Sequence, residues 1–130
     1  MVLDPVGDYL IRIKNAVACK HDDVMIPYSK LKEAISKILL DCRLIAAYQV
    51  VGNVPKKHIK IDLKYQSSKS CISDLKRISK PGRRVYVGHE EIPRIQRGFG
   101  VAVLSTPKGV LSDKDAREQH LGGELLLAIW

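Results

Sequence analysis

Residues 58–65 carry the pattern that most constrains the fold, a strict alternation of apolar and polar side chains. The apolar positions are Ile59, Ile61, Leu63 and Tyr65, and the polar positions between them are His58, Lys60, Asp62 and Lys64. Because successive side chains of a β-strand point to opposite faces, this pattern predicts a strand with one buried face and one solvated face. Such a strand needs neighbouring strands and a layer that covers its apolar face.

Two helical patterns earlier in the chain supply that layer. Asp4 is a candidate N-cap, and Pro5 suits the first helical position, where its missing N–H costs nothing. The apolar positions of this first helix are Val6, Leu10, Ile13 and Val17. Ser29 is a candidate cap for the second helix, whose apolar face is Leu31, Ala34, Ile35, Ile38 and Leu39. With strands at 24–27 and 45–51, residues 1–66 are expected to form an α/β lobe of two helices on a small sheet.

The second half of the chain has shorter elements and more turns. Residues 66–70 are polar, which favours a connecting segment. Beyond them we expect strands at 72–78, 83–87, 101–104 and 125–130, and one helical turn at 91–95. Ser112 begins a capping-box pattern for a brief helix that ends near Gly122 and Gly123. The sequence therefore predicts an α+β protein of two small lobes, in which residues 67–130 form a mainly β lobe with a short helix.

The distribution of charge favours a polyanionic partner. The net charge is +8, from 22 Lys and Arg against 14 Asp and Glu. Between residues 76 and 97 only Glu90 and Glu91 oppose a group of seven basic side chains, which are Lys76, Arg77, Lys80, Arg83, Arg84, Arg94 and Arg97. Interleaved apolar residues place these charges on folded elements rather than on a disordered tail. Nucleic acid is the favoured partner. The alternatives are a basic protein without such a partner and a protein-interaction module that binds an acidic protein.

The sequence favours neither a metal site nor catalysis. The three cysteines lack a CxxC pair, and the histidines do not fall at metal-ligand spacing. Asp113, Asp115 and Glu118 near His120 could suggest acid–base chemistry. Acidic residues at the start of a short helix, however, complement its dipole without any chemistry. We expect no enzyme activity, no cofactor, no metal and no small-molecule substrate.

The expected location is the cytoplasm, or the equivalent space of an organelle. No stretch approaches the roughly 20 apolar residues that cross a bilayer, so no contact with a membrane is expected. The N-terminal residues show neither a secretory nor a myristoylation pattern.

Six blocks of sequence resemble one known family, in its order and at its spacing over essentially the whole chain. They are residues 4–16, residues 77–86, Gly98-Phe99-Gly100, residues 104–109, residues 113–117 and Gly122-Gly123-Glu124. On these blocks the chain is identified as a member of the S-eight family of small-subunit ribosomal proteins, of the bacterial type. The resemblance implies a protein that binds the central domain of small-subunit ribosomal RNA early in assembly and contacts neighbouring ribosomal proteins. In some bacteria such a protein also represses translation by binding its own messenger.

The resemblance also implies which residues meet RNA. In the family, the loop that matches Ser105, Thr106, Pro107, Lys108 and Gly109 contacts an irregular internal loop of an RNA stem. Hydroxyl groups and glycine suit that contact, and Lys108 would add a phosphate contact. An ordinary tight turn is the alternative. The family's usual residue at position 107 is serine. Proline has neither a hydroxyl nor an N–H, so we expect weaker specificity at this point.

Further residues are implied at three other places. Gly122, Gly123 and Glu124 form a second block, in which the carboxylate could accept from a base amino group or a 2′-hydroxyl. Tyr86 could stack on a base, or it could belong to a core. Arg83 and Arg84 point to opposite faces of the expected strand, so one of them is expected to reach phosphate. A secondary RNA surface is implied at Asp4, Arg12, Asn15, Ser29 and Lys30, although helix capping also accounts for Asp4 and Ser29.

Overall fold

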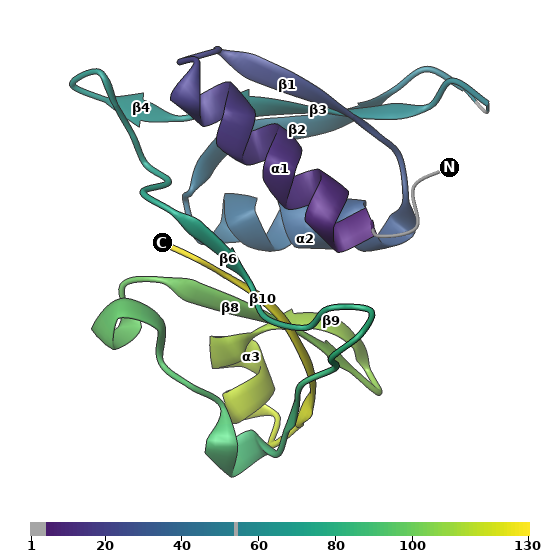
Figure 1. Cartoon of the computed structure of the whole chain (residues 1–130), viewed down its shortest axis with the longest axis vertical. Helices are drawn as coiled ribbons and strands as arrows, with labels where there is room; N and C mark the ends of the chain where they lie inside the picture. Colours follow the sequence, from purple (N-terminus) through teal and green to yellow (C-terminus); the bar gives the residue numbers. More distant parts are fainter. Residues whose placement is uncertain (1–4, 54) are drawn as a thin grey trace. The chain divides into compact units, whose positions relative to one another are not determined.

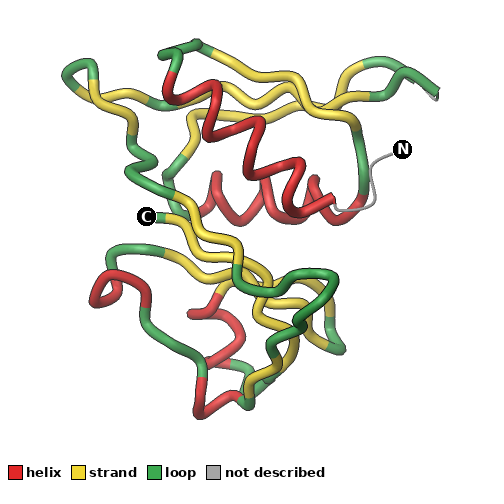
Figure 2. Tube along the Cα trace, viewed as in Figure 1, coloured by secondary structure: helices red, strands yellow, loops and turns green. Residues whose placement is uncertain are grey.

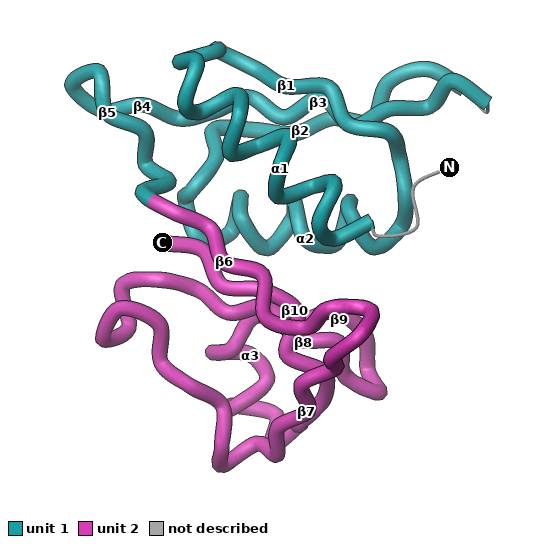
Figure 3. The backbone as a smooth tube through the Cα atoms, in the orientation of Figure 1, with its two compact units in different colours: residues 1–73 teal, residues 74–130 magenta. Residues whose placement is uncertain are grey.

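The computed structural model describes residues 5–53 and 55–130 and divides the chain into two compact units, residues 1–73 and 74–130 (Figure 3). The expected cap Asp4 therefore lies outside the described residues. The sequence placed the division after Gln66, whereas the compact units divide between Ser73 and Asp74. Each unit contains helix and sheet, and the second is mainly β with one short α-helix, which confirms the α+β class.

The first unit is a three-stranded antiparallel sheet with two helices on one face (Figures 1 and 2). Helix α1 spans Pro5–Ala18 and α2 spans Lys30–Asp41. The strands are β1 (Asp23–Pro27), β2 (Ile45–Val51) and β3 (His58–Leu63), and β3 lies between the other two. In β3 the side chains of Ile59, Ile61 and Leu63 are buried, whereas those of the intervening residues are only partly covered. The alternation in the sequence is thereby confirmed as one buried face and one solvated face.

Both predicted helices form. Ser29 caps α2, because its Oγ accepts a hydrogen bond from the Lys32 N–H at 3.1 Å. The buried stripe of α2 is rotated from the predicted one: Leu31 and Ala34 are only half-buried. Its buried members are Lys32, Ile35, Ser36, Ile38 and Leu39. Two polar side chains therefore enter the interior of the unit, and both find partners there.

The expected connector at 66–70 is wrong in its local structure. Strands β4 (Tyr65–Gln66) and β5 (Lys69–Ser70) pair as a short hairpin instead. Its turn residues Ser67 and Ser68 have left-handed backbones, with φ of 50° and 67°. Polar composition alone does not distinguish a turn from a linker, because both are solvated.

The second unit is built around β10 (Gly123–Ile129). On one side β10 pairs with β8 (Val101–Thr106), which pairs in turn with β9 (Gly109–Ser112). Along its other edge β10 pairs with β7 (Tyr86–Val87) near its start and with β6 (Leu75–Arg77) near its end. All five residues from Leu125 to Ile129 are buried. The chain's longest continuous apolar run therefore becomes a strand covered on both faces.

Several elements of this unit differ from the sequence predictions. Strands β6 and β7 are shorter than expected, since a loop that includes a Lys80–Arg83 turn separates them. The single helical turn is replaced by two 3₁₀ segments, η1 (His89–Glu91) and η2 (Ile95–Gly98). Strand β9 was not predicted, because four residues after a turn show no alternation of their own. Helix α3 (Asp113–Glu118) follows its predicted cap, with Ser112 Oγ accepting from the Asp115 N–H at 3.3 Å.

A buried hydroxyl chain links the two helices of the first unit. The Tyr9 hydroxyl and Ser36 Oγ lie 2.9 Å apart, and Ser36 Oγ donates to the Lys32 carbonyl at 2.8 Å. The Tyr9 hydroxyl is therefore the donor in the first bond. Burial raises the pKa of Tyr9 above its usual value of 10.0. As the pH rises past about 10, the unfolded chain loses this proton before the folded chain does, so stability falls.

Replacing Tyr9 with phenylalanine should lower the free energy of unfolding by about 1 kcal/mol at neutral pH, because one buried hydrogen bond is lost. Ser36→Ala should cost more, about 1–3 kcal/mol, since it leaves the Tyr9 hydroxyl without its partner. Tyr9→Phe should also reduce the loss of stability above pH 10 relative to the parent chain. Urea unfolding followed by circular dichroism measures all three effects. Equal stability of Tyr9→Phe and parent at neutral and alkaline pH would contradict the assignment.

Candidate nucleic-acid interface

Three of the residues implied by the resemblance lie in one row across neighbouring strands. Glu124 of β10 pairs with Ser105 of β8 on one side and with Tyr86 of β7 on the other. Residues directly opposite each other in antiparallel strands direct their side chains to the same face. Tyr86 is 69% exposed, which decides against its alternative place in a core. The row therefore presents a hydroxyl, a carboxylate and an aromatic ring together.

An arginine holds the carboxylate at the centre of this row. Arg84 Nη1 donates to Glu124 Oε2 at 3.1 Å, and the Glu124 side chain is only 17% exposed. The other carboxylate oxygen of Glu124 has no partner among the described residues. The ion pair thus orients the carboxylate and leaves one oxygen able to accept a further hydrogen bond.

Hydrogen bonds within residues 79–85, just before β7, position Arg83 and Arg84. The Ser79 hydroxyl accepts from the Val85 N–H at 3.0 Å, and Lys80 and Arg83 exchange two backbone hydrogen bonds of 2.9 Å. Arg83 is exposed at the end of this turn. Burial, and then the nearby charge of Arg84, lower the pKa of Arg77. The guanidinium groups of Arg77 and Arg84 therefore lie close enough for their charges to interact.

The buried Thr106 side chain stabilises the turn between β8 and β9. This residue is buried, and its Oγ1 donates to the Gly109 carbonyl at 2.7 Å and accepts from the Lys108 N–H at 3.2 Å. Pro107 and Lys108 are exposed at the tip, and Gly109 supplies a φ of +112°. Ser105 is half-buried. Thr106 therefore shapes the turn, while Pro107 and Lys108 are the residues that the turn presents.

Gly122 and Gly123 are needed for close packing of backbones. A Cβ atom at Gly123 would clash with the Ser105 carbonyl oxygen, and one at Gly122 would clash with the Val87 carbonyl oxygen. The two glycines therefore allow β10 to enter between β7 and β8. They act on the interface through this packing, which places Glu124 in its row.

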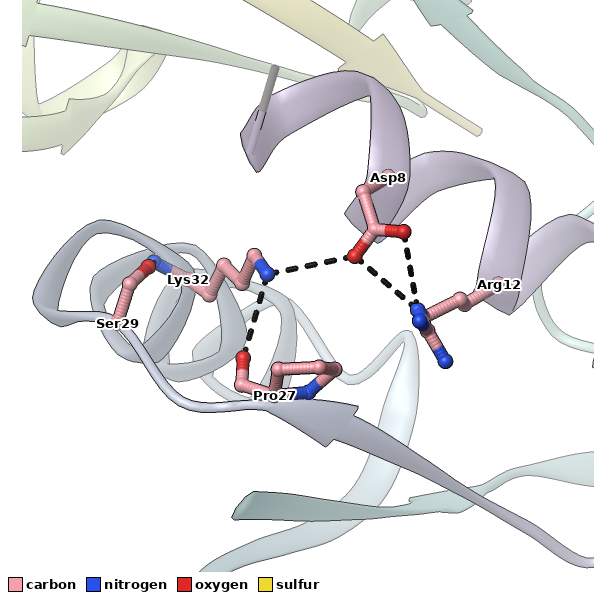
Figure 4. A network of polar contacts seen from close by, with 5 residues as sticks. All are labelled: Asp8, Arg12, Pro27, Ser29 and Lys32. Atoms are coloured by element: carbon pink, nitrogen blue, oxygen red, sulfur yellow. Dashed lines mark hydrogen bonds and ion pairs between the residues drawn. The ribbon is translucent and has the colours of Figure 1, made fainter. Parts of the chain in front are cut away.

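Two of the residues implied for the first unit, Arg12 and Ser29, lie in a polar cluster that contains the buried Lys32 (Figure 4). Asp8 accepts from Arg12 Nε at 3.0 Å and from Lys32 Nζ at 3.3 Å. Lys32 Nζ also donates to the Pro27 carbonyl at 3.2 Å. The Ser29 hydroxyl is engaged in its cap, as the alternative for that residue expected. Arg12, Asn15 and Lys30 are exposed.

Lys32 is the residue of this cluster that the sequence reading missed. It lies three and seven positions before Ile35 and Leu39 of α2, which are both fully buried. Its place on the helical stripe was therefore readable from spacing. The sequence nevertheless did not predict its burial, because lysine is rarely buried without a paired acid and the paired acid, Asp8, is 24 residues away in the chain.

Asp113, one of the acidic residues near His120, serves the fold. Asp113 is buried, pairs with Arg117 at 2.9 Å and accepts from the Ala102 N–H at 3.3 Å. Among the described residues, no group of three or more His, Cys, Asp and Glu side chains could hold a metal ion. The described helices include none that is long and apolar enough to cross a membrane.

The chain is similar to known proteins along nearly its whole length. The family model described as "Ribosomal protein S8" matches residues 4–130. A protein of Dictyoglomus thermophilum named "Small ribosomal subunit protein uS8" is 52% identical over 129 residues, which cover 99% of this chain and 98% of that protein. Proteins of the same name from Dehalococcoides mccartyi and Mycoplasma mobile are 47% and 45% identical. The match to the Dehalococcoides protein covers 100% of this chain and 100% of that protein. The match to the Mycoplasma protein covers 100% of this chain and 98% of that protein.

Gly123→Ala should destabilise the second unit by about 3 kcal/mol, because β8 and β10 must separate to admit the methyl group. Thermal unfolding measures this change. Gly82→Ala is the matched control, since a Cβ there meets no atom within 4 Å and the backbone is not left-handed. Equal destabilisation by both substitutions would contradict the steric role of Gly123.

Proposed function

This chain belongs to the ribosomal protein S8 family, and we propose that, as a constituent of the small ribosomal subunit, it binds the central domain of that subunit's RNA directly. The observation that carries this proposal is the row of Ser105, Glu124 and Tyr86 on one face of the second unit's sheet. These residues come from three separate stretches of the sequence, and exposed basic residues lie on the segments next to them.

Each member of the row suits a different feature of an irregular RNA stem. The open oxygen of Glu124 can accept from the amino group of an unpaired or splayed base, or from the 2′-hydroxyl of a ribose. Ser105 can both donate and accept. The exposed ring of Tyr86 offers a stacking surface. A regular duplex displays its 2′-hydroxyls but offers few free base faces or amino groups, because its bases are paired and stacked and its deep groove is narrow.

The basic residues contribute affinity rather than sequence preference. Lys108 at the tip of the β8–β9 turn and Arg83 at the end of the Lys80–Arg83 turn are the proposed phosphate contacts. Arg84 acts through Glu124, whose carboxylate it orients. In the first unit, Arg12, Asn15 and Lys30 form the proposed secondary RNA surface, with Asp8 and Lys32 holding Arg12 in place.

The proposal extends to the partners and the place of action. Assembly of the subunit platform would bring the chain against neighbouring ribosomal proteins in the cytoplasm or an organelle. The chain would also repress its own messenger if that messenger presents the same irregular stem. We propose no catalytic role, since Asp113 is committed to the fold. Competition by the messenger for the ribosomal stem checks the repressor role, and a messenger that fails to displace the stem contradicts it.

Glu124→Gln should reduce the preference for an irregular central-domain stem over a plain RNA duplex by about tenfold. The substitution keeps the shape of the side chain but replaces an acceptor oxygen with a donor. A well-placed contact contributes about 1–3 kcal/mol of discrimination, of which 1.4 kcal/mol is tenfold. A gel-shift titration of both RNAs at two salt concentrations measures it. Glu118→Gln, an exposed carboxylate on α3, is the control. Equal and steeply salt-dependent binding of parent chain to both RNAs would leave only a basic patch and overturn the proposal.

Pro107→Ser should increase discrimination for the irregular stem, because it supplies a hydroxyl and an N–H at the exposed tip of the turn. Thr106 holds the turn in both chains, so the overall site should be kept. The same paired titration gives the ratio of the two affinities. An unchanged ratio would show that position 107 makes no base contact.

A further inference from the structure

The chain's single phenylalanine is its most exposed large apolar side chain among the described residues. Phe99 is 91% exposed and follows η2 in the turn that leads into β8. Isolated apolar side chains are common on protein surfaces, so exposure alone carries no argument. Phe99 differs from such isolated side chains because hydrogen bonds fix the backbone that carries it and because two arginines are exposed in the same short segment.

The backbone around Phe99 is fixed to the core at both ends. Ile92 belongs to the buried cluster of the second unit and Ile95 packs against it. The Phe99 N–H donates to the Gln96 carbonyl at 3.1 Å, and the Gly100 N–H donates to the Ile95 carbonyl at 3.0 Å. A Cβ at Gly100 would lie 2.9 Å from the Ile129 carbonyl oxygen, so the turn lies directly on β10.

The conformation of this turn is one that side chains disfavour. Gln96 and Arg97 have left-handed backbones, with φ of 49° and 58°, and Gly98 follows with φ of 94°. Consecutive left-handed residues other than glycine are rare and persist where the surrounding structure imposes them. The turn therefore fixes the backbone that carries an aromatic ring in solvent, which lowers the backbone entropy lost when a ligand binds the ring.

The charges beside the ring point to the chemistry of its ligand. The exposed side chains of this segment are Arg94, Gln96, Arg97 and Phe99. Residues 92–100 contain two arginines and no acidic residue. An exposed aromatic ring on a short segment that also exposes two arginines matches an unpaired base and its phosphates, because every base has a face for stacking and the phosphates attract the arginines. An acidic peptide would satisfy the arginines but would leave the ring unused.

We propose that Phe99 is a stacking site for an unpaired base of the bound RNA, with Arg94 and Arg97 contacting the adjoining phosphates. This inference rests on the proposed RNA-binding function and adds a second contact to it. Strand β8 separates the two sites, because it begins two residues after Phe99 and ends at Thr106. Six residues of strand at about 3.3 Å each place them about 20 Å apart. Phe99 therefore contacts a different nucleotide from those at the Glu124 row.

Three substitutions at one position test the stacking contact on the central domain of small-subunit ribosomal RNA. Phe99→Ala should weaken binding about tenfold, within the range that alanine substitution of stacking aromatics shows. Phe99→Tyr should restore the parent affinity, because it keeps the ring. Phe99→Leu should bind like Phe99→Ala, since it is apolar but has no π-face. Met25→Ala, which removes an apolar side chain of the first unit that is 44% exposed, is the matched control and should change nothing.

The salt dependence of RNA binding distinguishes the contribution of the Phe99 ring from that of the nearby arginines. Phe99→Ala should leave the slope of log affinity against log salt unchanged, whereas Arg97→Ala should reduce it by about one. Irradiation of the parent complex should cross-link the peptide that contains Phe99 to a nucleotide. Unchanged RNA affinity of Phe99→Ala, or parent-like affinity of Phe99→Leu, overturns the stacking site. Unchanged RNA affinity with impaired assembly into subunits also overturns it, in favour of a protein contact.

The two proposals fail in distinguishable ways. If the parent chain prefers the irregular stem and Glu124→Gln removes that preference, the proposed function stands whatever Phe99 does. If the parent chain shows no preference for the stem, the proposed function is wrong, and the stacking site, which rests on it, is wrong too. Urea unfolding of Phe99→Ala should match that of the parent, because the side chain contributes little to the core.

Discussion

The close approach of β10 to β8 and β7 is the constraint on which the second unit depends. It is possible only because residues 122 and 123 have no side chains, so that their backbones can lie against the carbonyl oxygens of Val87 and Ser105. The register that results sets Glu124 between Ser105 and Tyr86. It also directs the apolar run that follows into the interior, where every residue from 125 to 129 is buried. Core and surface of this unit therefore depend on the same backbone contact.

Both units place a carboxylate inside a basic environment and hold it with cations. Arg84 pairs with Glu124 in the second unit, and Arg12 and Lys32 share Asp8 in the first. In a chain of net charge +8, such acids reduce repulsion among neighbouring cations. They also fix long flexible side chains that would otherwise lose entropy on binding. The pair at Glu124 differs because one carboxylate oxygen stays open, whereas both oxygens of Asp8 receive hydrogen bonds.

Strand β8 joins two features of different chemistry. Its C-terminal end leads into the turn that presents Pro107 and Lys108, beside the row that contains Glu124. Its N-terminal end follows the rigid turn of Phe99. The strand between them is buried almost throughout, so it holds the two ends at a fixed separation. A rigid spacer of this kind suits a partner whose own features lie at fixed distances, as those of a folded RNA do.

The sequence by itself determined the elements whose evidence is local: the alternation of β3, the cap at Ser29, the cap at Ser112 and the α+β class. Through a resemblance carried by short blocks, it also predicted which residues meet RNA, and that contact stays a prediction. Only the tertiary structure decided which of those residues act together. Ser105, Glu124 and Tyr86 meet because of strand register, Thr106 turns inward to hold its own turn, and Lys32 is buried because Asp8 reaches it from another helix. Local patterns report which face of an element is apolar. They contain no information on hydrogen-bond register between strands that are distant in sequence, and that register is what brings Ser105, Glu124 and Tyr86 together.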